Sequence, residues 1–91
     1  MASKTYGVGV IGLGYWGKNY LRLVSQLSSS GSSVRLVAMA DIFQESLDFQ
    51  KTIYPGVKAY SSEDDLLADQ DVDVVVIVTQ AATHFQVASK A

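Results

Sequence analysis

One stretch decides the fold of this chain: Gly12-Leu13-Gly14-Tyr15-Trp16-Gly17. It follows an apolar run, Tyr6 to Ile11, and precedes a segment in which apolar residues recur at helical spacing. Gly12 allows a tight turn out of a strand, Gly14 lets a phosphate approach the backbone, and Gly17 lets a helix lie close to the strand. The first N–H groups of such a helix lack partners inside it and bind anions. The stretch therefore predicts a dinucleotide-binding turn. A turn that needs glycine only for packing is the alternative.

Length and composition indicate one small globular domain over residues 1–91, with no internal boundary or repeat. The chain is 48% hydrophobic and 18% charged, its net charge is −2, and its pI is about 5.0. This balance argues against a nucleic-acid partner. The absence of cysteine excludes disulfides, zinc–thiolate sites and thiol catalysis. No apolar run approaches the ~18 residues of a membrane span, so we expect no membrane partner. The absence of cysteine fits the cytoplasm, where we expect the protein.

Apolar runs and helical patterns alternate along the chain. We expect four strands, at Tyr6–Ile11, Val34–Ala40, Val57–Tyr60 and Asp73–Thr79. We expect helices at Tyr15–Ser28 and Phe43–Ile53, a brief one around Leu66, and a last one from His84 to Ala91. This α/β alternation with right-handed crossovers predicts a Rossmann-type parallel sheet in the order 3-2-1-4. A ligand then belongs at the carboxyl ends of the first and fourth strands.

Local signals predict how the helices pack and end. The first helix is expected to bury an apolar face made of Trp16, Tyr20, Leu23, Val24 and Leu27. The second has a weaker face, made of Phe43, Leu47 and Tyr54. Gly31 is available as a left-handed cap after the first helix. Ser62 and Asp65 resemble a capping box for the brief helix.

Asp41 ends the second strand, 24 residues after Gly17. In the dinucleotide-binding fingerprint, an acidic residue about 20 residues after the turn accepts hydrogen bonds from the adenosine ribose hydroxyls. A carboxylate there repels a 2′-phosphate, and no arginine follows it, so we expect NAD rather than NADP as the cofactor. The alternative is that Asp41 and Gln44 form an N-cap pair for the second helix. The two roles are compatible.

The segment Thr79–His84 follows the fourth strand and supplies a possible opposite wall for a cofactor. His84 is the single histidine and a possible proton carrier, although a structural or positioning role is favoured because no partner carboxylate is near it in the sequence. The acidic residues between Glu63 and Asp73 lack metal-binding spacing, so no metal site is expected. The candidate cofactor-binding residues are Gly12, Leu13, Gly14, Tyr15, Trp16, Gly17, Asp41, Thr79, Gln80 and His84. No catalytic residue is assigned.

With these residues in place, the chain resembles the N-terminal nucleotide-binding domain of the glucose-fructose oxidoreductase / inositol dehydrogenase / MocA family. The matching segments are Val10–Gly17, Val37–Asp41 and Asp71–Thr79, together with His84, and the resemblance extends from Tyr6 to Ala91. It implies NAD(P)-dependent oxidation or reduction of CH–OH groups in sugars, cyclitols or related compounds. Gln80 stands where family members usually have proline.

By the same resemblance, two functional parts of the family are not found among these residues. The family's E-K-P segment, with the expected catalytic lysine, and its substrate domain are not among them. We therefore expect a truncated product or domain fragment that holds the ADP half of the cofactor. An exposed edge of the fourth strand predicts self-association. The alternative function is a stand-alone, non-enzymatic module that binds NAD(H) or another nucleotide such as CoA.

Overall fold

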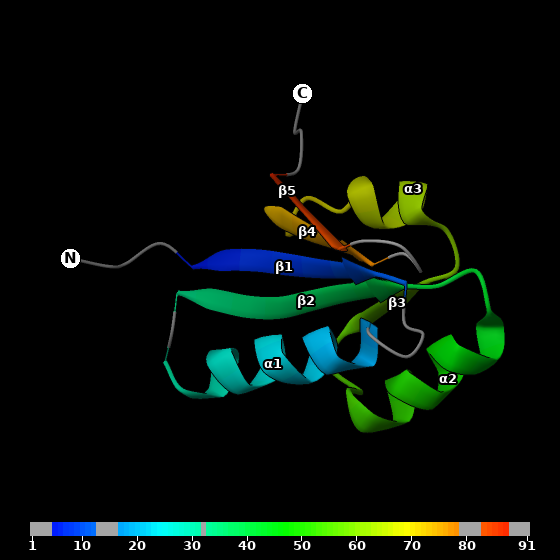
Figure 1. The fold of residues 1–91 in the computed structure, drawn as a ribbon, viewed down its shortest axis with the longest axis horizontal. Coiled ribbons are helices and arrows are strands. Elements are labelled where there is room, and N and C mark those ends of the chain that lie inside the picture. The colour runs from blue at the N-terminus through cyan, green and yellow to red at the C-terminus, as the bar shows by residue number, and fades with distance from the viewer. Residues whose placement is uncertain (1–4, 13–16, 32, 79–82, 88–91) are drawn as a thin grey trace.

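The computed structural model describes residues 5–12, 17–31, 33–78 and 83–87, the last of these as backbone only. The described elements follow one another as β1 (Tyr6–Ile11), α1 (Gly17–Ser29), β2 (Val34–Ala40), α2 (Gln44–Ile53), β3 (Lys58–Tyr60), α3 (Glu63–Leu67), β4 (Val74–Val78) and β5 (Thr83–Val87). The strands form one sheet in the order β3-β2-β1-β4-β5 (Figure 1).

The first four strands run parallel, in the order that the sequence predicts. β1 lies between β2 and β4, with Ile11 opposite Ala40 on one side and Ile77 on the other. β3 pairs with β2, with Tyr60 opposite Ala40. The ends of β1, β2, β3 and β4 therefore meet at one edge, which we call the carboxyl edge of the sheet. The predicted sheet order is confirmed for these four strands.

Helices cover both faces of the sheet (Figure 1). α1 and α2 lie on one face, where Val10, Leu21 and Met39 belong to one buried cluster. α3 lies on the other face, where Leu66 and Val75 belong to a second cluster. Strands buried on both faces read as continuous apolar runs rather than alternating ones, which explains the sequence pattern of β1, β2 and β4.

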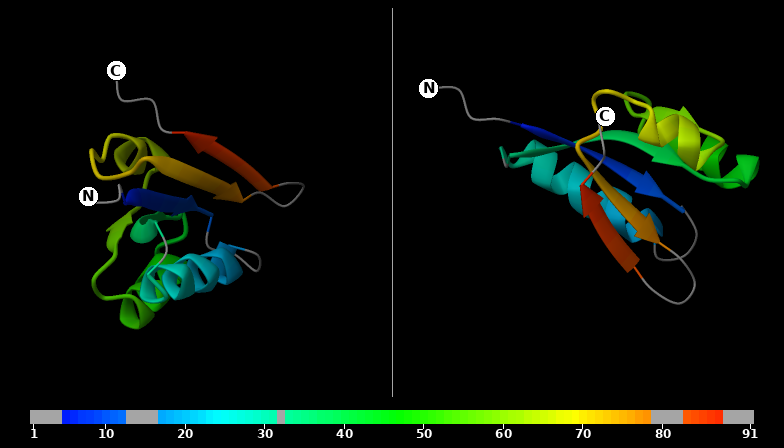
Figure 2. Two further views of the ribbon diagram at one scale, coloured as in Figure 1. Left: turned by 90° about the vertical axis from the view of Figure 1, so that its left-hand side faces the viewer. Right: turned by 90° about the horizontal axis from the view of Figure 1, so that it is seen from above.

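Residues 83–87 form a strand, so the prediction of a helix beginning at His84 is wrong. β5 runs antiparallel to β4, with Thr83 opposite Val78 and Val87 opposite Val74 (Figure 2). Backbone N–H and C=O groups along an unpaired strand edge need partners, and a following segment that turns back supplies them. The β4 edge for which the sequence predicts exposure is covered by β5, so that prediction is also wrong.

α1 presents a different face to the sheet from the one its sequence suggests. Leu21 and Val24 are buried, whereas Leu23 and Leu27 are 49% and 40% exposed. Both ends of the helix are tied to strands. Gly17 lies against Gly12, and the Ser28 hydroxyl donates to the Val34 carbonyl (3.2 Å) and accepts from the Leu36 N–H (3.1 Å). These contacts set the rotation of the helix, so the predicted face is wrong for Leu23 and Leu27.

The other local predictions are confirmed in part. Leu47 of α2 is buried, but Phe43 is exposed because it is the N-cap residue, before the first turn. Gly31 has a φ of +83° after the end of α1. The Ser62 side chain caps α3 by accepting from the Asp65 N–H (3.4 Å). Of the helices in the described part of the chain, none is both long and apolar enough to cross a membrane.

Candidate functional site

A hollow of about 120 Å³ opens at the carboxyl edge of the sheet, between the ends of β1 and β2 and the start of α3. Its described lining residues are Ile11, Gly12, Ala40, Asp41, Ile42 and Glu63. We call it the Asp41 hollow. It brings together Gly12 and Asp41, two site residues predicted from the sequence that lie 29 positions apart in the chain.

Gly12 and Gly17 are required as glycines by the backbone around them. Gly12 has a φ of +89°, a conformation that other residues rarely adopt, and a Cβ there would overlap the Val78 carbonyl oxygen. A Cβ on Gly17 would overlap the Gly12 carbonyl oxygen. The N–H of Gly12 donates to the Ala40 carbonyl (2.9 Å), which joins the ends of β1 and β2. The predicted need for glycine at position 12 and the close approach at Gly17 are therefore confirmed.

Asp41 is held at the hollow from both sides. Its carboxylate Oδ1 accepts from the Phe43 N–H (2.9 Å), and its own N–H donates to the Tyr60 carbonyl (3.2 Å). The side chain stabilises the turn that leads into α2 without being its N-cap, because Phe43 occupies that position. Gln44 donates instead to Asp48 (2.8 Å). The predicted Asp41–Gln44 capping pair is therefore wrong, and Asp41 keeps its place in the hollow.

Glu63 is not among the site residues predicted from the sequence, where it belongs to an acidic segment without metal-binding spacing. The structure places it, exposed, at the first position of α3 and in the lining of the Asp41 hollow. The signal that could have identified Glu63 is the strand order of the sheet. Because β3 pairs with β2, a residue just after Tyr60 lies beside the residue just after Ala40.

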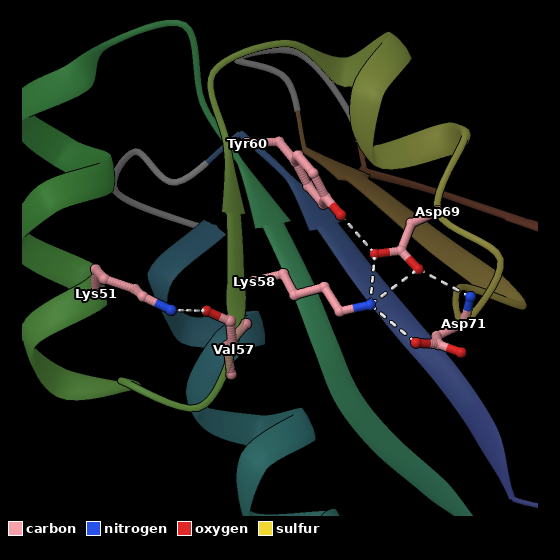
Figure 3. Close-up of polar contacts among 6 residues, drawn as sticks. All are labelled: Lys51, Val57, Lys58, Tyr60, Asp69 and Asp71. Atoms are coloured by element: carbon pink, nitrogen blue, oxygen red, sulfur yellow. Dashed lines mark hydrogen bonds and ion pairs between the residues drawn. The ribbon is translucent and has the colours of Figure 1, made fainter.

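A group of polar side chains ties β3 to the connection between α3 and β4 (Figure 3). We call Lys58, Tyr60, Asp69 and Asp71 the β3 clamp. Tyr60 Oη donates to Asp69 Oδ2 (2.6 Å), and Lys58 Nζ lies 3.0 Å from the same oxygen and 2.8 Å from Asp71 Oδ2. The Asp71 N–H donates to Asp69 Oδ1 (2.8 Å). Alternation along β3 places Lys58 and Tyr60 on the α3 face of the sheet.

The clamp shifts the pKa values of its members. Burial alone would raise the pKa of Asp69, whose side chain is 4% exposed. The hydrogen bonds from Tyr60, from the Asp71 N–H and from Lys58 outweigh burial and hold this pKa below its ordinary value. The hydrogen bond to Asp69 raises the pKa of Tyr60. Hydrogen bonds to Asp71 and Asp69 raise the pKa of Lys58.

The β3 clamp is connected to Asp41 through Tyr60. Tyr60 uses its hydroxyl for the clamp and its carbonyl for the Asp41 N–H. The turn between Tyr60 and Glu63 is therefore held on one side by the sheet and on the other by Asp69. On the opposite face of the sheet, Lys51 donates to the Val57 carbonyl and closes the turn after α2 (Figure 3).

A larger hollow of about 240 Å³ lies at the other end of the sheet, among Arg35, Gln70 and Asp73. Asp73 closes the amino end of β1 there: its Oδ2 accepts from the Gly7 N–H (2.8 Å) and its N–H donates to the Gly7 carbonyl (2.7 Å). In open α/β sheets, ligands bind at the carboxyl ends of the strands. The smaller Asp41 hollow is therefore the candidate site.

Several predicted site residues lie outside the described residues. They are Leu13, Gly14, Tyr15, Trp16, Thr79 and Gln80. His84 lies on β5, opposite Ile77, rather than in the first turn of a helix. Among the residues that the structure describes, no three His, Asp or Glu side chains are grouped to hold a metal ion.

Comparison with known proteins agrees with this fold. Residues 6–91 match the GFO/IDH/MocA family, described as an oxidoreductase family with an NAD-binding Rossmann fold. The chain belongs to this family. It is 34% identical over 88 residues to the inositol 2-dehydrogenase of Salmonella typhimurium, covering 92% of this chain and 24% of that protein.

Solved structures in the comparison share the fold. The myo-inositol dehydrogenase from Lactobacillus casei, in complex with NAD(H) and myo-inositol, matches with a TM-score of 0.68 and 28% identity, over 84% of this chain and 22% of that one. The WlbA dehydrogenase from Bordetella pertussis, in complex with NADH and UDP-GlcNAcA, matches with a TM-score of 0.71 and 25% identity, over 87% and 22%. The chain thus spans about a quarter of the length of these relatives.

Proposed function

We propose that the carboxyl edge of this sheet binds NAD for an oxidoreductase that acts on CH–OH groups of sugars, cyclitols or related compounds. The observation that carries this proposal is the meeting of Gly12 and Asp41 in one hollow. The family and the NAD(H) complex of the myo-inositol dehydrogenase support it.

Each described residue has a role that its geometry suits. α1 begins at Gly17 and has 13 residues, and its first N–H groups, which have no partners inside the helix, are assigned to the pyrophosphate. Asp41 accepts hydrogen bonds from the adenosine ribose hydroxyls, which favours NAD over NADP. We assign the remaining cofactor contacts to Leu13, Gly14, Tyr15, Trp16, Thr79, Gln80 and His84.

These roles separate what the cofactor supplies from what residues 1–91 do. Bound NAD supplies the nicotinamide ring that accepts or donates a hydride. Residues 1–91 form one nucleotide-binding domain whose part is to hold and orient the ADP half of the cofactor. The substrate site and the catalytic lysine are assigned outside these residues. We place the protein in the cytoplasm, to which a chain without cysteine is suited.

The test is a calorimetric titration of the chain with NADH, together with the fluorescence of Trp16, its single tryptophan. Asp41→Asn retains one oxygen for the Phe43 N–H and removes the charge. It should weaken NADH binding about 10-fold or more, because a hydrogen bond to a charged group contributes about 1.5–3 kcal/mol.

Asp48→Asn is the matched control, because it removes the same charge from an exposed position on α2. It should leave NADH binding within about twofold. An absence of NADH binding by the wild-type chain would overturn the proposal. Equal losses in the two variants would remove Asp41 from the site.

A further inference from the structure

Two carboxylates face the Asp41 hollow, although the dinucleotide-binding fingerprint accounts for one. Among the described residues that line it, the charged ones are Asp41, at the end of β2, and Glu63, at the start of α3. Asp41 is 8% exposed and engaged by the Phe43 N–H, whereas Glu63 is exposed. The hollow is therefore negative on two sides.

The position of Glu63 is built into the fold. The Ser62 side chain caps α3 through the Asp65 N–H. Tyr60 is joined to Asp41 by its carbonyl and to Asp69 by its hydroxyl (2.6 Å, Figure 3). The short turn that carries Glu63 thus begins at a residue fixed on both sides. Glu63 faces the hollow for structural reasons, and not as an incidental member of an acidic surface.

We propose that Glu63 is a second specificity determinant, which disfavours cofactors that carry a 2′-phosphate on the adenosine ribose. This inference rests on the proposed function of the Asp41 hollow. A phosphate monoester carries a charge of about −1.5 to −2 at neutral pH, so a carboxylate on each side opposes it from two directions. NADH has hydroxyls at that ribose and meets no such repulsion.

Within the described part of the chain, the residues next to the hollow give a 2′-phosphate little compensation. Lys58, on neighbouring β3, is paired with Asp69 and Asp71. The residues that follow Asp41 are Ile42 and Phe43, both exposed and apolar. Glu63 is therefore the charge whose removal most directly changes the balance between NADH and NADPH while Asp41 stays in place.

The experiment compares NADH and NADPH binding by calorimetry for the wild-type chain and Glu63→Gln. The variant should bind NADH within about twofold of wild type and bind NADPH about 3- to 10-fold more tightly at low ionic strength. Because Glu63 is exposed, the gain should shrink toward zero in about 0.5 M salt. Glu63→Lys should give a larger gain for NADPH.

Asp64→Asn is the matched control, since it removes one negative charge from the same helical turn at a residue outside the described lining of the hollow. It should leave the NADPH-to-NADH ratio unchanged within about twofold. Equal gains from the two variants, parallel changes for both cofactors, or no gain for NADPH would overturn this inference while NADH binding by the wild type stands. Loss of NADH binding by the wild type itself would overturn the proposed function as well.

Discussion

Replacing Asp69 with asparagine tests whether the β3 clamp stabilises the domain. The Asp69 carboxylate is 4% exposed and accepts from three groups: Tyr60 Oη at 2.6 Å, the Asp71 N–H at 2.8 Å and Lys58 Nζ at 3.0 Å. An asparagine keeps one carbonyl oxygen and turns an NH₂ group toward donors. At least one of these partners is then left without an acceptor.

The magnitude follows from the individual contacts. A hydrogen bond to a charged group contributes about 1.5–3 kcal/mol. The pair with half-exposed Lys58 contributes at most about 1 kcal/mol, because solvent screens it. With one bond retained by the asparagine, we expect Asp69→Asn to lower the free energy of unfolding by about 2 kcal/mol. For a domain of this size that corresponds to a fall in Tm of about 8–16 °C.

The assay is urea unfolding followed by circular dichroism, with Asp71→Asn as the control. Asp71 is 59% exposed, and its carboxylate contacts the same lysine. Its substitution removes an equal charge and should cost at most about 0.5 kcal/mol. A double-mutant cycle of Asp69→Asn with Tyr60→Phe should show coupling of about 1 kcal/mol. If Asp69→Asn lowered the free energy of unfolding no more than Asp71→Asn does, the clamp would be a surface charge cluster that does not stabilise the domain.

The pH dependence gives a second check on the same residue. The pKa of Asp69 is lower in the folded chain than its ordinary value of 3.8, so its ionised form is stabilised by folding. This contribution is complete above the unfolded pKa and is lost as pH falls through the folded value. The stability difference between wild type and Asp69→Asn should be constant from pH 7 to about 5 and shrink below about pH 4. For Tyr60 the sign is reversed. Its pKa is raised in the folded chain, so folding stabilises the protonated hydroxyl, and this contribution to stability is lost as pH rises above about 10.

Two further substitutions test the packing that shapes the site. Leu21→Ala should lower the free energy of unfolding by about 2–5 kcal/mol in a urea titration, because Leu21 is fully buried. Leu23→Ala should lower it by less than about 1 kcal/mol, because Leu23 is 49% exposed. A larger loss for Leu23→Ala than for Leu21→Ala would refute the observed face of α1. Gly17→Ala should abolish NADH binding and lower Tm, since the added Cβ overlaps the Gly12 carbonyl, whereas Gly56→Ala, where a Cβ meets nothing within 4 Å, should leave calorimetric NADH binding unchanged.

The sheet order could be predicted because several local signals agreed. Val10, Met39 and Val75 lie in runs too apolar for a half-exposed sheet, and they are buried in the structure. Three glycines at fixed spacing marked where the first strand gives way to a helix. Asp41, at the end of the next strand, then had to lie near that turn, because neighbouring parallel strands end at the same edge.

The rotation of α1 could not be predicted from its own sequence. Leu21, Leu23, Val24 and Leu27 define two overlapping apolar faces, and periodicity does not choose between them. The choice is made by contacts outside the helix: Gly17 against Gly12, and the Ser28 hydroxyl against β2. The same limit applies to Glu63, because its sequence neighbours are acidic and exposed. Its place at the Asp41 hollow comes from the pairing of β3 with β2.

The error at β5 concerns how a strand edge is satisfied. A helix after β4, as predicted from the sequence, leaves the β4 edge exposed, and such an edge predicts self-association. Yet Thr83, Phe85 and Val87 are residues that favour strands, and they alternate with His84 and Gln86. In the structure this segment pairs with β4 over its full length. The backbone N–H and C=O groups along the β4 edge therefore pair with β5 of the same chain. Closing a short connection within one chain costs less entropy than binding a second molecule.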